Sequence, residues 1–149
     1  MITTKNLNDV RKQIVKLVKD EMYVVVRALD DDFNRKIFEM NDVDMIVGLE
    51  SRGERDYMKQ RNSGMNEVLC KLAKKNDIKI GVEVEKIFGL GKIEKARVLA
   101  RVSQNIKLCK RVGCKIVLLC DQCKLSKQDI MGFFKVLGGS TKQGKIGKK

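Results

Sequence analysis

The chain has 149 residues, with 32 Lys and Arg against 19 Asp and Glu, so its formal net charge is +13. This length suits a single domain and is too short for a complete eight-fold βα barrel, which needs about 250 residues. The sequence contains no His, which excludes His-based zinc sites, His-based phosphoesterase clusters and the Ser-His and Cys-His catalytic pairs.

The pattern of apolar residues predicts one helix followed by four strand–helix units. Continuous β-branched runs, such as Val24-Val25-Val26, are typical of strands buried on both faces. Apolar residues three and four positions apart predict helices, the first capped by Asn6 or Asn8 and the last by Ser126. In chain order, we expect helices over residues 6–20, 33–40, 64–76, 93–112 and 126–137, strands over 22–26, 44–49, 78–84 and 115–120, and loops over 50–63 and 87–92.

This alternation of strands and helices predicts a parallel sheet with right-handed crossovers. Four units could form half of a βα barrel or a small open sheet. Half a barrel leaves two strand edges and part of its inner face uncovered, so we expect a partner or self-association. We assign residues 1–139 to a single α/β domain and residues 140–149, which carry four lysines, to a flexible basic tail.

Composition also predicts the compartment of the protein and the kind of partner that it binds. No apolar run approaches the roughly 20 residues of a membrane span, and the first nine residues lack the apolar stretch of a signal peptide, so we expect a cytoplasmic protein. Aromatic residues make up 5% and Trp is absent, which argues against a platform that stacks several bases. The excess positive charge predicts attraction to phosphate polymers or anionic membranes, of which we favour the polymers.

The expected helix 93–112 has a basic face with few acidic neighbours. Residues 92–115 contain eight Lys and Arg and one acid, Glu94, so acidic partners one turn away are largely missing. A charge run is often only a solvated face, and this interpretation stays open beside contact with RNA phosphates. The candidate RNA-binding residues of this helix are Arg97, Arg101, Lys107 and Arg111.

A second candidate is the segment that enters the expected helix 64–76. It would leave the carboxyl end of a parallel strand, where ligand sites usually lie, and a helix N-terminus binds phosphate through its free amides. Asn62 or Ser63 could equally be no more than a helix cap. The candidate RNA-binding residues here are Arg61, Ser63, Lys71, Lys74 and Lys75.

Cys120-Asp-Gln-Cys123 has the spacing of a redox motif or of half a zinc site. A zinc ion would need two more ligands, and Cys109 and Cys114 are the nearest in sequence. Cys114 and Cys120 bracket an expected strand and would lie about 20 Å apart when extended, so they cannot easily share one ion. We favour buried structural thiols over a redox or metal role.

Two further patterns give no site. The acids at 30–32 and at Glu83 and Glu85 could bind Mg²⁺, but such clusters are common without a metal. The Gly89-Leu-Gly91 run lacks the third glycine of a dinucleotide fingerprint, because position 94 is Glu. We therefore expect no catalytic residue, no metal site and no cofactor bound by the protein.

Four segments, taken together, resemble a known family. They are RNSGMNEVLCKLAKKNDIKIG at 61–81, EKARVLAR at 94–101, NIKLCK at 105–110 and SKQDIMGFFKVLG at 126–138. Their order and spacing are similar to archaeal ribonuclease P protein component 3, the thirty-kilodalton-subunit family, over about residues 21–138. Lys127 replaces the family's proline before the last helix, and the chain resembles a shortened member.

The resemblance implies an α/β fold of parallel βα units, a partial or shortened TIM-barrel-like (PHP-like) fold. It implies a subunit of the ribonuclease P endonuclease, in which the RNA hydrolyses precursor tRNA to remove its 5′ leader and the proteins supply positive charge and affinity. The implied partners are the ribonuclease P RNA, precursor tRNA and other protein subunits, including a small ferredoxin-like one. Mg²⁺ would serve the RNA.

Two other functions stay open. A general basic scaffold for ribosomal or other structured RNA would share the charge but not the run of motifs. A metal-dependent phosphoesterase on a PHP-like barrel would need clustered imidazoles, which a chain without His cannot supply.

Overall fold

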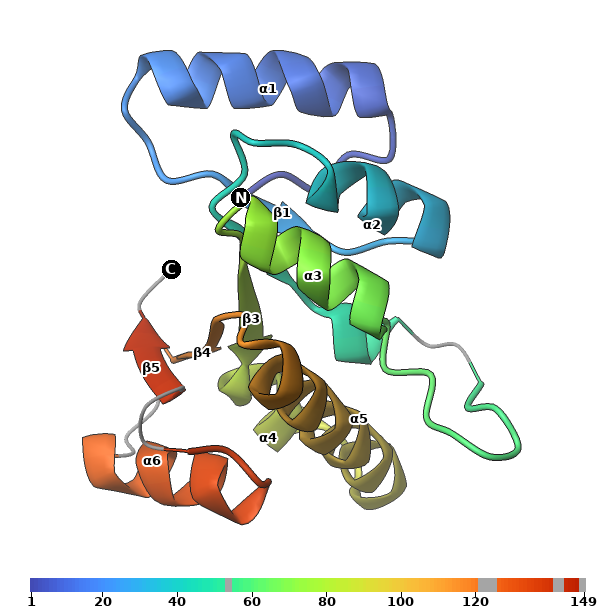
Figure 1. The fold of residues 1–149 in the computed structure, drawn as a ribbon. Helices are drawn as coiled ribbons and strands as arrows, with labels where there is room; N and C mark the ends of the chain where they lie inside the picture. The colour runs from blue at the N-terminus through green and yellow to red at the C-terminus, as the bar shows by residue number, and fades with distance from the viewer. Residues whose placement is uncertain (53–54, 121–125, 141–143, 148–149) are drawn as a thin grey trace.

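The computed structural model describes residues 1–52, 55–120, 126–140 and 144–147. Parallel strands and helices alternate along the chain (Figure 1). The strands are β1 (Val25–Arg27), β2 (Met45–Val47), β3 (Lys79–Glu83), β4 (Ile116–Leu119) and β5 (Gly144–Gly147). The helices are α1 (Leu7–Lys19), α2 (Asp31–Phe38), the 3-10 turn η1 (Leu49–Ser51), α3 (Glu67–Lys75), α4 (Val84–Gly89), α5 (Lys92–Val112) and α6 (Lys127–Val136).

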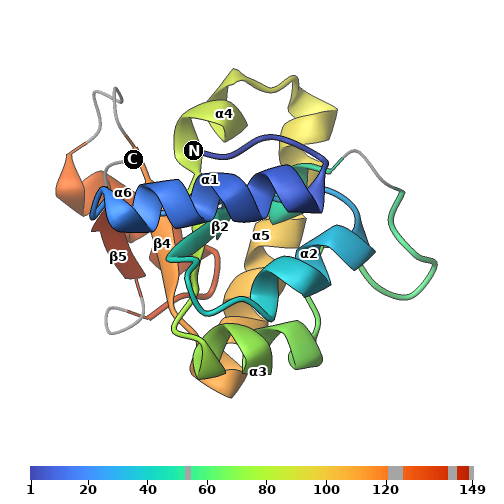
Figure 2. The ribbon, with the colours of Figure 1, turned by 90° about the horizontal axis from the view of Figure 1, so that it is seen from above.

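The sheet keeps the order of the chain, β1-β2-β3-β4-β5, and each neighbouring pair is parallel. A doubly wound sheet reverses its order at a switch point, whereas a βα barrel does not. Helices α1, α2, α3 and α5 follow one another along one side of the strands (Figure 1). In the view from above, α1 crosses in front of the other elements (Figure 2). The expectation of a parallel α/β fold that corresponds to part of a TIM-like barrel is confirmed.

Both ends of the sheet are extended by short segments. Beside β1, the amide of Ile2 donates to the carbonyl of Val25 at 2.8 Å, and the amide of Arg27 donates to the carbonyl of Ile2 at 2.9 Å. At the other end, β5 pairs with β4, with Ile146 opposite Leu118. The expected flexible tail over 140–149 is therefore wrong at 144–147, because backbone pairing along an open strand edge does not require an apolar segment.

Helix ends follow local capping, with two corrections. Asn6 caps α1 and Ser126 caps α6, as expected from the sequence. Helix α3 begins later than expected, at Glu67, because the Asn66 side chain accepts a hydrogen bond from the Leu69 amide. Neither Asn62 nor Ser63 caps this helix. The expected loop 87–92 is also wrong in part, because α4 continues to Gly89.

The sheet buries apolar side chains on both faces. The larger cluster fills the space between the strands and the helices, and it includes Ile37, Ile80, Ile106 and Phe134. A smaller cluster lies on the opposite face and consists of Val25, Met45, Val47, Val117 and Leu119. Gly81 belongs to this second face, where an added Cβ would lie 2.7 Å from both Met45 Sδ and Val47 Cγ1. The inner face of the partial barrel is therefore packed so closely at Gly81 that β3 admits no side chain at that position.

Candidate nucleic-acid interface

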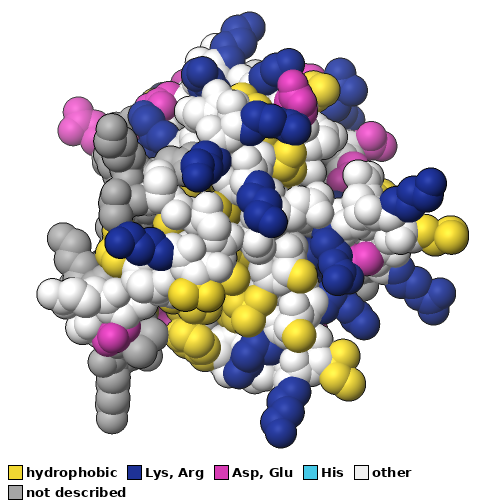
Figure 3. Space-filling view, turned by 60° about the horizontal axis from the view of Figure 1, so that its bottom comes forward, with side chains coloured by type: hydrophobic (Ala, Val, Ile, Leu, Met, Phe, Trp, Pro, Cys, Tyr) yellow, Lys and Arg dark blue, Asp and Glu magenta, His cyan; other side chains and the backbone are white. Residues whose placement is uncertain are grey.

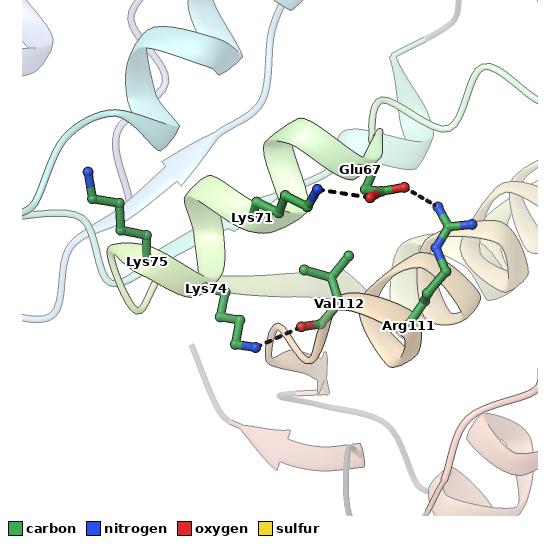
Figure 4. Close-up of a pocket in the computed structure, with 6 residues that line it drawn as sticks. All are labelled: Glu67, Lys71, Lys74, Lys75, Arg111 and Val112. Atoms are coloured by element: carbon green, nitrogen blue, oxygen red, sulfur yellow. Dashed lines mark hydrogen bonds and ion pairs between the residues drawn. The ribbon is translucent and has the colours of Figure 1, made fainter.

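Helices α3 and α5 pack side by side and leave a groove of about 650 Å³ between them. The groove is lined by four cations and one carboxylate, together with Val112 (Figure 4). The cations are Lys71, Lys74, Lys75 and Arg111, and the carboxylate is Glu67. We call this surface the α3–α5 groove.

Ion pairs hold the two walls of the α3–α5 groove together. Glu67 accepts from Lys71 Nζ at 3.0 Å on its own helix and from Arg111 at 2.9 Å across the groove. The hydrogen bond from Lys71, with the charges of Lys71 and Arg111, holds the pKa of Glu67 below its ordinary value. One carboxylate therefore positions two cations at the groove.

The remaining two lysines are arranged differently. Lys74 Nζ donates at 3.0 Å to the carbonyl of Val112, at the end of α5, where an ammonium also satisfies the negative end of the helix dipole. Lys75 is exposed and points away from the other labelled residues (Figure 4). Because four cations and a single acid line the α3–α5 groove, it keeps a net positive charge that suits a phosphate backbone.

The basic residues expected on α5 do not form one patch. Arg111 joins the α3–α5 groove, whereas Arg97 lies fourteen positions earlier, about 21 Å along the helix axis. Arg97 and Lys107 are both exposed. Lys and Arg side chains are spread over one face of the molecule with hydrophobic side chains between them (Figure 3). The sequence shows that these α5 residues are basic. Only the packing of α5 against α3 brings Arg111 into the groove.

Arg101 is placed inside the protein, with 3% of its side chain exposed. Its Nε donates to Asp56 Oδ1 at 2.9 Å and a second guanidinium nitrogen donates to the carbonyl of Glu50 at 3.2 Å. These contacts join α5 to the segment that follows β2. Arg101 therefore cannot contact RNA in this structure, and its expected role in binding is corrected to a structural one.

Ser63 is also buried, with 1% exposed. Its hydroxyl accepts from Gln104 Nε2 at 3.2 Å, and its carbonyl accepts from Asn105 Nδ2 at 3.0 Å. The segment before α3 thus packs against α5 instead of presenting its hydroxyl to a ligand. We remove Ser63 from the residues expected to contact RNA.

Arg61 remains at the surface, where its guanidinium contacts Asp56 Oδ2 at 3.1 Å. Burial by itself would raise the pKa of Asp56, but hydrogen bonds from the Asn62 amide, Arg101 and Arg61 outweigh it and hold the pKa below its ordinary value. Arg61 and Arg111 also line a second groove of about 490 Å³, beside Asp31 and Asp32 of α2. The mixed charge of that groove makes it a poorer phosphate site than the α3–α5 groove.

The carboxyl ends of the strands hold two buried carboxylates, of which sequence reasoning considered Glu83 and missed Glu50. Glu83 is 3% exposed and accepts from Arg27 at 2.8 Å and from Lys86 at 3.0 Å. Glu50, directly after β2, is 1% exposed, and burial raises its pKa to about 7. The position of Glu50 at the carboxyl end of a buried strand is the signal by which the sequence could have identified it. The cations on Glu83 leave it a poor Mg²⁺ ligand, and no site of that kind is assigned.

The cysteines divide into two groups. Cys70, Cys109 and Cys114 are free and buried. The interpretation of Cys120 as a buried structural thiol is wrong, because this residue is disulfide-bonded and only half-buried, and Cys123 lies outside the described residues. Within the described part of the chain, no helix combines the length and apolar character that a bilayer span requires.

The fold and this surface together define a class: a small basic βα protein whose sheet is part of a barrel and whose helices form a cationic groove. No family model matches the chain. Over 117 residues it is 25% and 26% identical to ribonuclease P protein component 3 from Methanococcus maripaludis strains C7 and C6. The corresponding protein of Methanococcus vannielii is 24% identical. The resemblance expected from the four segments is confirmed.

These matches cover 78% of this chain but only 47% of the Methanococcus maripaludis proteins, so the chain spans about half the length of the curated relatives it matches. A chain in the cryo-EM structure of archaeal ribonuclease P with mature tRNA superposes with a TM-score of 0.73 at 22% identity. That match covers 93% of this chain and 58% of the other, and it shows that the two share a fold.

Proposed function

We propose that this chain is an RNA-binding protein subunit of ribonuclease P, supporting a catalytic RNA in the removal of 5′ leaders from precursor tRNA. The observation that carries the proposal is the α3–α5 groove, with four cations against one carboxylate, on a chain similar to ribonuclease P protein component 3. The solved structure with the same fold comes from archaeal ribonuclease P bound to mature tRNA, which supports the same assignment.

In this role the protein contributes electrostatics and leaves the chemistry to the RNA. Phosphates would enter the α3–α5 groove and share the cations that Glu67 now positions. Each phosphate contact releases condensed counterions, so binding weakens steeply as salt rises. The exposed residues Arg61, Arg97 and Lys107 would add contacts on neighbouring surfaces.

The partners of this function are the ribonuclease P RNA, precursor tRNA and other ribonuclease P proteins, among them a small ferredoxin-like subunit. The endonuclease activity belongs to the assembled enzyme, and its Mg²⁺ serves the RNA. Binding of RNA by the groove requires no cofactor on this protein and no membrane contact.

The experiment that tests this function is crosslinking in cells, followed by sequencing of the RNA attached to the protein. Enrichment of one structured non-coding RNA with a ribonuclease P core, together with precursor tRNA, supports the subunit role. Crosslinks spread over ribosomal or messenger RNA without that species would overturn it and favour a general RNA scaffold. A Lys71→Glu/Lys74→Glu variant expressed at the same level serves as the control for contacts through the groove.

A further inference from the structure

Three cysteines that lie far apart in the sequence meet beneath the α3–α5 groove. Cys70 comes from α3, Cys109 from α5 and Cys114 from the residues just before β4. All three are free thiols, exposed by 0%, 0% and 3%. Their Sγ atoms all lie within 4.8 Å of one another. The fold therefore brings three sulfur atoms, from three different parts of the chain, close together in the core.

The spacing of these sulfurs fits a metal ion. A thiolate lies about 2.3 Å from zinc, so three thiolates around one ion would be about 4 Å apart. A triangle with sides of at most 4.8 Å reaches that size when each sulfur moves inward by about 0.5 Å or less. Such a shift is within the range of side-chain rotation, and no element needs to move.

The donor set determines which ions fit. Thiolates are soft ligands that select Cu⁺ and Zn²⁺ over Mg²⁺ and Ca²⁺, which prefer oxygen. The chain has no His to add a nitrogen ligand. Three buried sulfurs suit Cu⁺ directly, whereas tetrahedral Zn²⁺ would take a water as its fourth ligand.

The three thiols and their neighbours shift one another's pKa values in opposite directions. Hydrogen bonds from Cys109 and Cys70 lower the pKa of Cys114, with a further contribution from the charge of Lys74. The pKa of Cys109 is raised by its hydrogen bonds with Cys114 and Cys70 and by burial. Lys74, a wall residue of the α3–α5 groove, supplies positive charge beside Cys114.

We propose that Cys70, Cys109 and Cys114 form a binding site for one soft metal ion, Cu⁺ or Zn²⁺, that ties α3, α5 and the start of β4 together beneath the α3–α5 groove. The alternative is that three small side chains pack as ordinary apolar residues. The two differ in a measurable way, because a core residue tolerates an apolar replacement of similar size and a ligand does not.

The test uses the full-length protein, reduced and kept without oxygen. It is titrated with Cu⁺ and, separately, with Zn²⁺ and with Co²⁺ as a coloured substitute for Zn²⁺. We expect one equivalent of at least one ion to bind, with ultraviolet sulfur-to-metal charge-transfer absorption and a higher Tm. X-ray absorption at the metal edge should show three sulfur neighbours at about 2.3 Å.

Two variants assign the site. Cys109→Val keeps an apolar side chain in the core and should lose the bound equivalent and the metal-dependent rise in Tm. Cys120→Ser removes a cysteine outside the cluster and should keep both, which excludes the Cys120–Cys123 spacing as the source. Cys70→Ala provides a second removal if Cys109→Val folds poorly by circular dichroism. The proposal is overturned if the reduced protein binds no ion, or if Cys109→Val and Cys70→Ala bind as much as the unchanged protein.

Discussion

Arg101 and Asp56 form a charge pair at 2.9 Å between α5 and the segment after β2, with 3% and 14% of their side chains exposed. Removing one partner of a buried pair typically costs about 3–5 kcal/mol. Because Asp56 keeps Arg61 and the Asn62 amide, we expect Arg101→Met to lower the free energy of unfolding by about 2–3 kcal/mol. Denaturant unfolding measures this loss of free energy.

The control is Arg97→Met, at an exposed position of the same helix, which should change the free energy of unfolding by about 0.5 kcal/mol or less. Equal losses in both variants would contradict the structural role of Arg101.

Buried Glu50 should make the protein less stable as pH rises. Its pKa is about 7 when folded and 4.5 when unfolded, so between these values only the unfolded state releases the proton. The free energy of unfolding should therefore fall by about 3 kcal/mol from pH 4.5 to above 7. Glu50→Gln should flatten the curve over this window, while Glu39→Gln at the surface should not. Asp56 has a lowered pKa, so its contribution to the free energy of unfolding is lost at lower pH, where its carboxylate becomes protonated.

Reversing charge in the α3–α5 groove should weaken RNA binding. For Lys74→Glu/Lys75→Glu we expect a loss of roughly 10-fold or more at moderate salt and a shallower dependence of affinity on salt, by about one unit of slope or more. Filter binding to a ribonuclease P RNA transcript across a salt series measures both. Lys12→Glu/Lys16→Glu, on exposed positions of α1, changes the net charge equally. Equal losses in the two variants would mean that only total charge matters and that the groove is not the contact surface.

Gly64 holds a backbone conformation that other residues adopt with strain. Its φ is +72°, and an added Cβ would lie 2.5 Å from the carbonyl oxygen of Leu49. We expect Gly64→Ala to destabilise the fold by about 1–3 kcal/mol, visible as a lower Tm. Gly132→Ala, inside α6 with open space around its Cβ, should be neutral or stabilising by up to about 1 kcal/mol. A neutral Gly64→Ala would refute the close approach to Leu49.

The sequence was sufficient for the order of the elements, because buried parallel strands leave continuous apolar runs such as Val24-Val25-Val26. It was not sufficient for β5, whose pairing depends on backbone groups along the edge of β4. Composition marked residues 140–149 as basic, and composition carries no signal for an edge strand. The start of α3 was misplaced because only Asn62 and Ser63 were considered as caps, whereas Ser63 packs against α5 and Asn66 caps the helix.

The site was predictable in its residue types and not in its grouping. Helical periodicity placed Arg101 on the basic face, but periodicity cannot show that Asp56 folds over that side of α5. Arg111 was assigned to one patch and Lys74 to another, and helix packing brings both to one groove. The thiol cluster was missed for the same reason. Cys70 and Cys109 are 39 positions apart, and only the packing of α3 against α5 makes them neighbours.

The strands of the sheet lie in the same order as in the chain, and this order affects how the protein folds during its synthesis. In the described part of the chain, each strand after β1 pairs with the strand synthesised just before it, so none of these strands waits for a distant partner. Domains begin to fold while the ribosome is still elongating the chain, and local contacts form faster than distant ones. The protein can therefore assemble unit by unit from its N-terminus, with β1 and β2 presenting the edge on which β3 is laid and β4 following. Because Cys114 is made last of the three cysteines, the thiol cluster closes only once β4 begins to emerge.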